Sequence, residues 1–143
     1  METFLDQRIN WDEYALRIAE VASMRSEDPY KKVGACALDF NNRVIGVAYN
    51  GLASGINVPH SFWNCRDERR KYMIHAEANL LSLFERNCCR LLACTLLPCS
   101  SCATLIAAHG IKRVVYKELY NRDMSALDIF DFYNIECVNI TYE

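Results

Sequence analysis

The strongest chemical pattern in the sequence is a histidine and a glutamate followed later by a pair of cysteines. His75 and Glu77 belong to the triplet HAE, and Cys99 and Cys102 belong to the segment PCSSC. Each cluster begins a predicted helix, directly after a loop or a strand. Cysteines three apart in the first turn of a helix share one face, so both sulfurs can reach one ion. The free N–H groups and the positive dipole end at a helix start also favour the thiolate form, which binds metal.

One imidazole and two thiolates predict a zinc site with an open position. A closed structural zinc site takes four protein ligands, whereas His75, Cys99 and Cys102 supply three. The fourth position is then available to water, whose pKa zinc lowers from ~16 toward ~7. Glu77 lies two residues after the histidine, close enough to contact that water without being a ligand itself. We therefore interpret Glu77 as the residue that moves protons.

The alternative interpretation is a structural zinc site, or a pair of cysteines that binds nothing. A structural site would need a fourth ligand from another cysteine. The other cysteines lie mostly in apolar surroundings, where a free thiol packs as a small hydrophobe, and we interpret them as buried. His60 lies in a long loop, and His109 lies at a predicted helix end, where a cation is favourable. The other cysteines are Cys36, Cys65, Cys88, Cys89, Cys94 and Cys137.

The elements that must position these residues begin with a helix and a hairpin. Asn10 and Glu13 predict a capping box, and apolar residues continue at helical spacing to about Arg25. Two runs rich in valine and alanine follow, separated by the turn signal Asn41–Asn42, which predicts a strand hairpin. The expected bounds are a helix over 11–25 and strands over 33–39 and 43–49.

The remainder of the chain predicts one sheet with helices on both faces. The segment 51–71 is rich in Gly, Asn, Pro and charged residues and is too long for a simple connection, so we interpret it as a binding loop. Beyond it, helices and strands alternate, and Gly110 is expected to stop one of the helices. Such alternation is typical of the α/β class. The expected helices span 75–85, 99–110 and 124–133, and the expected strands span 90–97, 112–116 and 136–142.

Composition and charge limit the classes of function. A length of 143 residues is expected to bury one core, which predicts a single domain. The net charge of -2 argues against stable nucleic-acid binding but permits a small anionic ligand held by a few local cations. The segment METFLDQRINWDEY has no apolar run long enough for export or a membrane span, so we expect a cytoplasmic protein without membrane attachment. The candidate cations are Lys31, Lys32, Arg66, Arg69, Arg70, Lys71 and Arg122.

From about residue 11 to residue 140 the sequence resembles the deoxycytidylate (dCMP) deaminases of the cytidine deaminase superfamily. The resemblance rests on SEDPYKKVGACALD, GVAYNG, HAE with AN after it, PCSSC with Ala103 after it, and HGIKRVVY. It implies one deaminase domain over residues 1–143, with a mixed five-stranded sheet between helices in three αβα layers. It also implies Zn²⁺-dependent hydrolysis of dCMP to dUMP and ammonia, a reaction that supplies dUMP for dTMP synthesis. By the same resemblance, His75, Cys99 and Cys102 are the zinc ligands and Glu77 is the acid-base residue.

The resemblance also indicates substrate contacts. Asn50, in YNG, matches an asparagine with which related deaminases hold the nucleoside, although a turn residue before a glycine is its simpler interpretation. Tyr120 and Arg122 follow a strand on the side where the ligand is expected, and aromatic burial and a surface charge explain them nearly as well. Backbone groups around Ala76 and Ser100 are expected to hold the edge of the base.

Regulation, assembly and substrate choice stay open at this point. Members of the family that respond to the effectors dCTP and dTTP commonly show SKDP and YNGxP, whereas this chain has Glu27 within SEDP and Leu52–Ala53 after YNG. Because Glu27 replaces a cation, charge repulsion disfavours a polyanionic effector. Members are often hexamers, which implies a homo-oligomer. The rival functions are deamination of cytidine, dCTP, guanine or tRNA adenosine, and a non-catalytic zinc-stabilised interaction module.

Overall fold

A computed structural model describes residues 7–142 and contains one mixed sheet of five strands. The strands lie in the order β2-β1-β3-β4-β5, and β1 pairs antiparallel with both β2 and β3. β3, β4 and β5 are parallel. The mixed five-stranded sheet expected from the sequence is therefore confirmed. The strands are β1 (Gly34–Asp39), β2 (Val44–Tyr49), β3 (Cys89–Leu96), β4 (Arg113–Glu118) and β5 (Glu136–Asn139).

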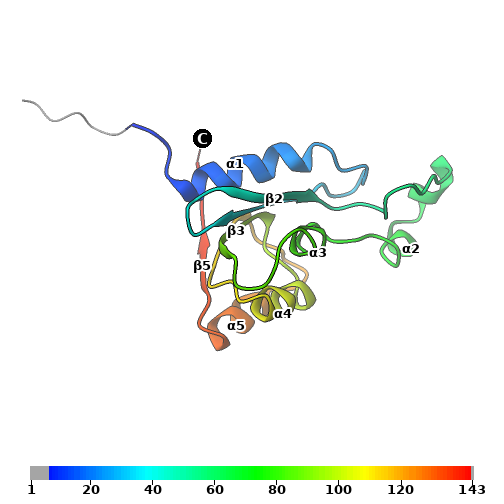
Figure 1. Cartoon of the computed structure of the whole chain (residues 1–143). Coiled ribbons are helices and arrows are strands. Elements are labelled where there is room, and N and C mark those ends of the chain that lie inside the picture. The colour runs from blue at the N-terminus through cyan, green and yellow to red at the C-terminus, as the bar shows by residue number, and fades with distance from the viewer. Residues whose placement is uncertain (1–6, 143) are drawn as a thin grey trace, which may run out of the picture.

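Helices cover both faces of this sheet, as predicted (Figure 1). α1 (Trp11–Ser23) lies on one face, and α3 (Ala76–Leu81), α4 (Ser100–Ala108) and α5 (Ser125–Phe132) lie on the other. A small core under α1 joins Leu16 to Leu38 and Leu91. A larger core on the opposite face includes Ile106 and Phe130. The helices on the two faces and the sheet between them form three layers, with one core on each side of the sheet.

The contact of α1 with the sheet depends on a glycine. The side chain of Asn10 caps the helix by accepting the backbone N–H of Glu13 at 2.9 Å, and the Glu13 carboxylate pairs with Arg17 one turn on at 2.7 Å. At the sheet, a Cβ on Gly34 would lie 1.8 Å from the carbonyl oxygen of Ala19. The backbones of α1 and β1 therefore approach too closely for any residue with a side chain.

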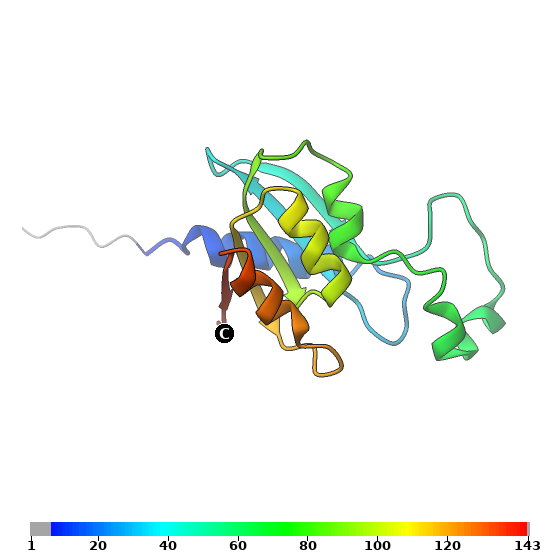
Figure 2. The ribbon, with the colours of Figure 1, turned by 90° about the horizontal axis from the view of Figure 1, so that it is seen from below.

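The segment between β2 and α3, interpreted from the sequence as a binding loop, has secondary structure that the sequence did not predict. It contains a 3-10 helix, η1 (His60–Asn64), and a single turn of α-helix, α2 (Arg66–Arg69). Neither is long enough to produce an apolar periodicity, which explains why the sequence pattern missed both. In Figure 2 this segment extends away from the sheet beyond α3.

Several other elements are shorter than their patterns predicted, and the helix expected over 11–25 ends at Ser23. The helix expected over 75–85 ends at Leu81, because Leu83 N donates to Leu80 O and the Ser82 hydroxyl donates to Asn79 O, which closes the last turn. The strand expected over 136–142 ends at Asn139. The helix expected to stop at Gly110 does so, with that glycine at a φ of 80°.

Within residues 7–142, no helix has the length and hydropathy needed to span a membrane.

Candidate metal centre and active site

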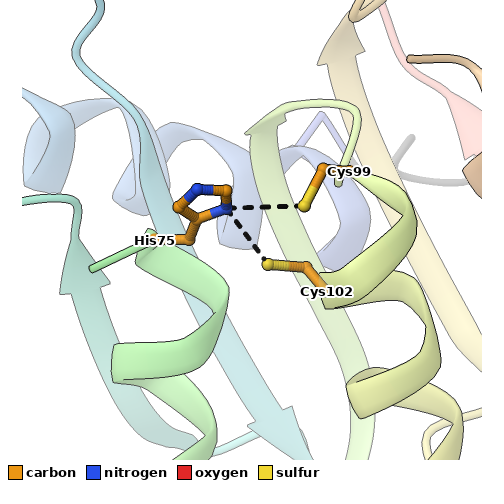
Figure 3. Close-up of side chains that lie close together, drawn as sticks. All are labelled: His75, Cys99 and Cys102. Atoms are coloured by element: carbon orange, nitrogen blue, oxygen red, sulfur yellow. Dashed lines mark hydrogen bonds between the residues drawn. The ribbon is translucent and has the colours of Figure 1, made fainter. Parts of the chain in front are cut away.

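The two predicted clusters meet where α3 and α4 begin on the same face of the sheet. His75 is the residue that precedes α3, Cys99 is the residue that precedes α4, and Cys102 lies in the first turn of α4. Their side chains point toward one another (Figure 3). His75 Nδ1 lies 3.5 Å from the sulfur of Cys99 and 3.3 Å from that of Cys102. The structure therefore brings together the three side chains that the sequence proposed as metal ligands.

The geometry of these three atoms fits zinc. A tetrahedral ion with a Zn–N distance of about 2.0 Å and Zn–S distances of about 2.3 Å places nitrogen and sulfur about 3.5 Å apart. The observed separations of 3.3 and 3.5 Å are close to that value. All three ligand atoms lie within 4.8 Å of one another, and among residues 7–142 the group comprises these three residues. The donor set of one imidazole and two thiols is one that zinc prefers.

The two thiols of the site are unequal. The thiol of Cys102 donates to Cys99, and this hydrogen bond, with a further contribution from His75, lowers the pKa of Cys99 to about 4. The same hydrogen bond raises the pKa of Cys102. Hydrogen bonding to Cys99 also raises the pKa of His75. The environment therefore favours the thiolate form of Cys99, and Cys102 must release its proton when a cation binds both sulfurs.

Glu77 lies beside this group in the first turn of α3. Its side chain is 4% exposed, and burial raises the pKa of the carboxyl group, while the nearby His75 acts in the opposite direction. A buried carboxyl group with a raised pKa can both accept and donate a proton near neutral pH. Glu77 thus has the position and the environment of an acid-base residue, and it is not part of the ligand group.

A pocket of about 440 Å³ opens onto these residues and has the size of a small-molecule site. His75, Glu77 and Cys99 line it together with a set of cationic side chains. Within residues 7–142, Arg66 and Arg122 have no carboxylate partner, so their charges are available to an anionic group. The cationic residues of the lining are Lys31, Arg66, Arg69, Arg70 and Arg122.

Four of the five predicted substrate contacts lie in this pocket. Ala76, Tyr120 and Arg122 line it, and so does Asn50. The Asn50 side chain also has a structural role, because its oxygen accepts Val33 N and its nitrogen donates to Lys31 O, both at 2.9 Å. These bonds fix the entry to β1 and leave one amide hydrogen of Asn50 for a ligand.

Ser100, the fifth predicted contact, lies outside the pocket lining. Its backbone N–H donates to Asp123 Oδ2 at 2.9 Å. This N–H is therefore already bonded within the protein, so a contact of Ser100 with the base would come from another backbone group, and the expected contact stays a prediction. Asp123 was not among the predicted residues, because the 23-residue separation from Ser100 gives no local signal.

Two further residues of the lining, one acidic and one aromatic, were not predicted from the sequence. Asp28 and Tyr30 belong to the lining, although neither was considered as a site residue. Arg66, Arg69 and Arg70 were predicted as candidate cations, but the sequence did not indicate that they line the same pocket as the metal ligands. The available signal was the strand pattern after residue 33, which places the preceding residues where that strand begins, next to the ends of neighbouring strands. That signal indicates a region of the fold, but it does not identify any particular side chain.

Residues 9–118 match the family model described as the cytidine and deoxycytidylate deaminase zinc-binding region. The match covers most of the chain and includes the three proposed ligands and Glu77. The chain belongs to this family. Its sheet order, its helices on both faces and its His/Cys/Cys group agree with that membership.

Within the family the chain is similar to deoxycytidylate deaminases. The human deoxycytidylate deaminase is 33% identical over 120 residues, which cover 78% of this chain and 66% of that protein. The chain thus spans slightly less than two thirds of the length of this relative. The deoxycytidylate deaminase of Mycobacterium phage D29 is 38% identical over 125 residues, covering 76% of this chain and 95% of that protein. The dCMP deaminase of cyanophage S-TIM5, solved in complex with dCMP and dUMP, superposes with a TM-score of 0.75 at 25% identity, over 90% of this chain and 95% of that chain.

Proposed function

We propose that this chain is a zinc-dependent hydrolase that converts dCMP and water to dUMP and ammonia. The observation that carries the proposal is the buried carboxyl group of Glu77 beside the convergent His75, Cys99 and Cys102, all at a pocket of nucleotide size. The deoxycytidylate deaminases to which the chain is similar support this choice of substrate. Residues 1–143 would act as one domain of this kind.

In this proposal, three residues of the site bind the metal and a fourth transfers protons. His75, Cys99 and Cys102 would hold zinc, a Lewis acid that makes water a nucleophile near neutral pH when it is bound. Glu77 would take a proton from the attacking water and deliver it to N3 of cytosine while the oxygen adds to C4. Glu77 would then transfer the second proton to the exocyclic nitrogen, which leaves as ammonia when the C4–N bond breaks. The burial of Glu77 keeps bulk water from competing for these protons.

The charges of the pocket support a nucleotide as substrate. A nucleoside monophosphate carries its negative charge several bonds away from the base, so a site for it needs an acid-base group at one place and cations at another. Arg66 and Arg122, which have no carboxylate partner within residues 7–142, meet the second requirement. Arginine is well suited to phosphate, because its planar guanidinium can donate two parallel hydrogen bonds.

The three-ligand group also favours an enzyme over a zinc-stabilised interaction module. A module would need a fourth protein ligand, and within residues 7–142 no fourth His, Cys, Asp or Glu joins the group. All eight cysteines, which lie in this range, have free thiols. Free thiols are consistent with the cytoplasmic location that we infer from the sequence.

Assembly and regulation belong to the proposal as well. We infer a homo-oligomer, with a hexamer implied by the resemblance. Effector binding by dCTP or dTTP is disfavoured, because Glu27 replaces the cation of the responsive family members and its negative charge would repel a polyanion. The Glu27 carboxylate accepts the backbone N–H of Leu52 at 3.2 Å.

The test is a substrate panel. Ammonia release is measured from dCMP, deoxycytidine, dCTP and guanine with the zinc-loaded protein, each with and without dTTP. The proposal expects the highest kcat/KM for dCMP. A higher value for any other member of the panel, or no turnover of dCMP by protein that holds zinc, would overturn it.

A further inference from the structure

One wall of the pocket is a segment that extends from the body of the protein. Residues 52–73 leave the sheet after β2 and return before α3, and they carry η1 and α2 (Figure 2). At its base, Gly51 and Ile74 exchange two backbone hydrogen bonds of 3.1 and 2.8 Å. We call residues 52–73 the wall segment. It contributes Arg66, Arg69 and Arg70 to the pocket lining.

The wall segment is attached to the body through residues 27–30. Arg69 and Asp28 form an ion pair whose side chains are 6% and 3% exposed. Arg69 Nε donates to Asp28 Oδ1 at 3.2 Å, and Arg69 Nη2 lies 3.0 Å from Asp28 Oδ2, so the contact is bidentate. Arg69 Nη1 also donates to the carbonyl oxygen of Arg66 at 3.1 Å. One guanidinium therefore fixes both its own helical turn and the distance of that turn from the body.

Tyr30 extends this attachment. Its ring lies under the guanidinium carbons of Arg69 and Arg66, at 4.5 and 5.5 Å from the ring centre. Its hydroxyl donates to the carbonyl oxygen of Trp63 in η1. Asp28 orients Tyr30 in turn, because Asp28 Oδ1 accepts the backbone N–H of Tyr30 at 2.8 Å. Tyr30 thus contacts both short helices of the wall segment.

Stability alone does not explain a buried ion pair at this position. The cost of removing both charges from water often exceeds their mutual attraction, so that a well-packed apolar pair is equally stable or more so. What a bidentate arginine–carboxylate contact provides is a fixed orientation. Arg66 and Arg70 lie three residues before and one residue after Arg69, and both line the pocket. Because Arg69 is held in one orientation, the positions of Arg66 and Arg70 beside it in the chain are held as well.

We propose that the Asp28–Arg69 pair, together with Tyr30, is a positioning device that sets the preference for a phosphorylated substrate. It holds Arg66 and Arg70 at the pocket so that they contact the anionic group of the nucleotide. The inference rests on the proposed function, because it assigns the recognition of the phosphate within the same site. Asp28, Tyr30 and Arg69 act through their neighbours and not on the reacting atoms.

The test compares dCMP with deoxycytidine in Arg69→Lys, which keeps a positive charge but loses the bidentate and stacked geometry. The ratio of kcat/KM for dCMP to kcat/KM for deoxycytidine is expected to fall about tenfold or more, through a higher KM for dCMP. Inorganic phosphate, used as a competitor of dCMP, is expected to inhibit with a correspondingly higher inhibition constant. Bound zinc is measured in the same samples and is expected to stay at the wild-type level.

Two further variants keep the test decisive. Tyr30→Phe retains the ring but loses the hydroxyl contact with Trp63, and it decides the question if Arg69→Lys fails to fold; a smaller fall in the same ratio is expected. Lys71→Gln is the matched control, because Lys71 is exposed, pairs with Glu68 in the same segment and does not line the pocket, so the ratio is expected to stay unchanged.

The outcomes separate this inference from the proposed function. If the wild-type protein prefers dCMP and the folded, zinc-loaded variants of Arg69 and Tyr30 retain that preference, the positioning role is wrong and the function stands. A fall of the same size in Lys71→Gln would also overturn the positioning role. If the zinc-loaded wild-type protein does not deaminate dCMP, the proposed function itself fails.

Discussion

Asp123 joins the start of α4 to the start of α5. Its Oδ2 accepts the backbone N–H of Ser100 at 2.9 Å, and its Oδ1 accepts that of Ser125 at 3.0 Å. Ser100 directly follows the proposed ligand Cys99, and the residues just before Asp123 include Tyr120 and Arg122 of the pocket lining. One carboxylate therefore connects the loop that lines the pocket to the start of α4, where Cys99 and Cys102 lie.

Replacing this carboxylate is expected to reduce stability in a pH-dependent way. The hydrogen bond from Ser100 N, with those from Ser125, lowers the pKa of Asp123 to about 2. A carboxyl group with a lowered pKa stabilises the folded state above its unfolded pKa of about 3.9, and this contribution is lost as the pH falls toward 2. Asp123→Asn should therefore have a lower Tm than the wild type at pH 6, and the difference should shrink below about pH 4. Thermal unfolding across this range measures it, and a difference that does not change with pH would contradict the assignment.

Glu77→Gln is expected to separate metal binding from catalysis. Glutamine keeps the size of the buried side chain but cannot carry the proton, so turnover of dCMP should fall by roughly 10²- to 10⁴-fold while zinc stays bound. Initial rates and metal analysis on the same protein test this. Glu85→Gln is the matched control, because Glu85 is exposed and outside the pocket lining, and it should keep full activity. Near-normal turnover by Glu77→Gln would remove Glu77 from the mechanism.

Cys102→Ser is expected to weaken zinc binding by about a hundredfold or more, since a hydroxyl is a much poorer zinc ligand than a thiolate. Competition with a chromogenic chelator measures the affinity. Cys88→Ser serves as the control: Cys88 is an exposed free thiol outside the ligand group, and its replacement should leave the affinity unchanged. Equal zinc affinities for the two variants would show that Cys102 is not a ligand.

Gly34→Ala tests the contact between α1 and the sheet. The added Cβ would lie 1.8 Å from Ala19 O and 2.7 Å from Ser23 N, both of them backbone atoms, so the helix has to move. Overpacking of this kind costs about 1–3 kcal/mol, and the free energy of unfolding in urea should fall by that amount. An unchanged free energy of unfolding would mean that α1 can shift without loss of packing.

The metal centre was predictable from sequence because each of its parts is local. Cys99 and Cys102 are three apart at a helix start, and Glu77 is two residues from His75, so spacing alone brings each pair together. The sheet was predictable for a similar reason, since its strands are continuous apolar runs between turn signals. What joins the two clusters in space is the pairing of β1 with β3, which no local pattern encodes.

The wall of the pocket was not predictable, because it depends on contacts between distant residues. Asp28 and Arg69 are 41 residues apart and are ordinary charged residues when considered singly. The turn that carries Arg69 has four residues, which is too short for a helical pattern. The same limit applies to Ser100, whose backbone N–H donates to Asp123, 23 residues further along the chain. In each case the decisive partner lies on another element, so side-chain roles could be assigned only from the folded chain.

X-ray absorption spectroscopy at the zinc edge tests the central claim most directly. Protein purified with its metal should contain one zinc per chain, bound by two sulfurs and one imidazole nitrogen, with a fourth light-atom ligand that exchanges with solvent. A spectrum with three or four sulfur ligands, or protein that deaminates dCMP with no transition metal bound, would contradict a catalytic centre built on His75, Cys99 and Cys102.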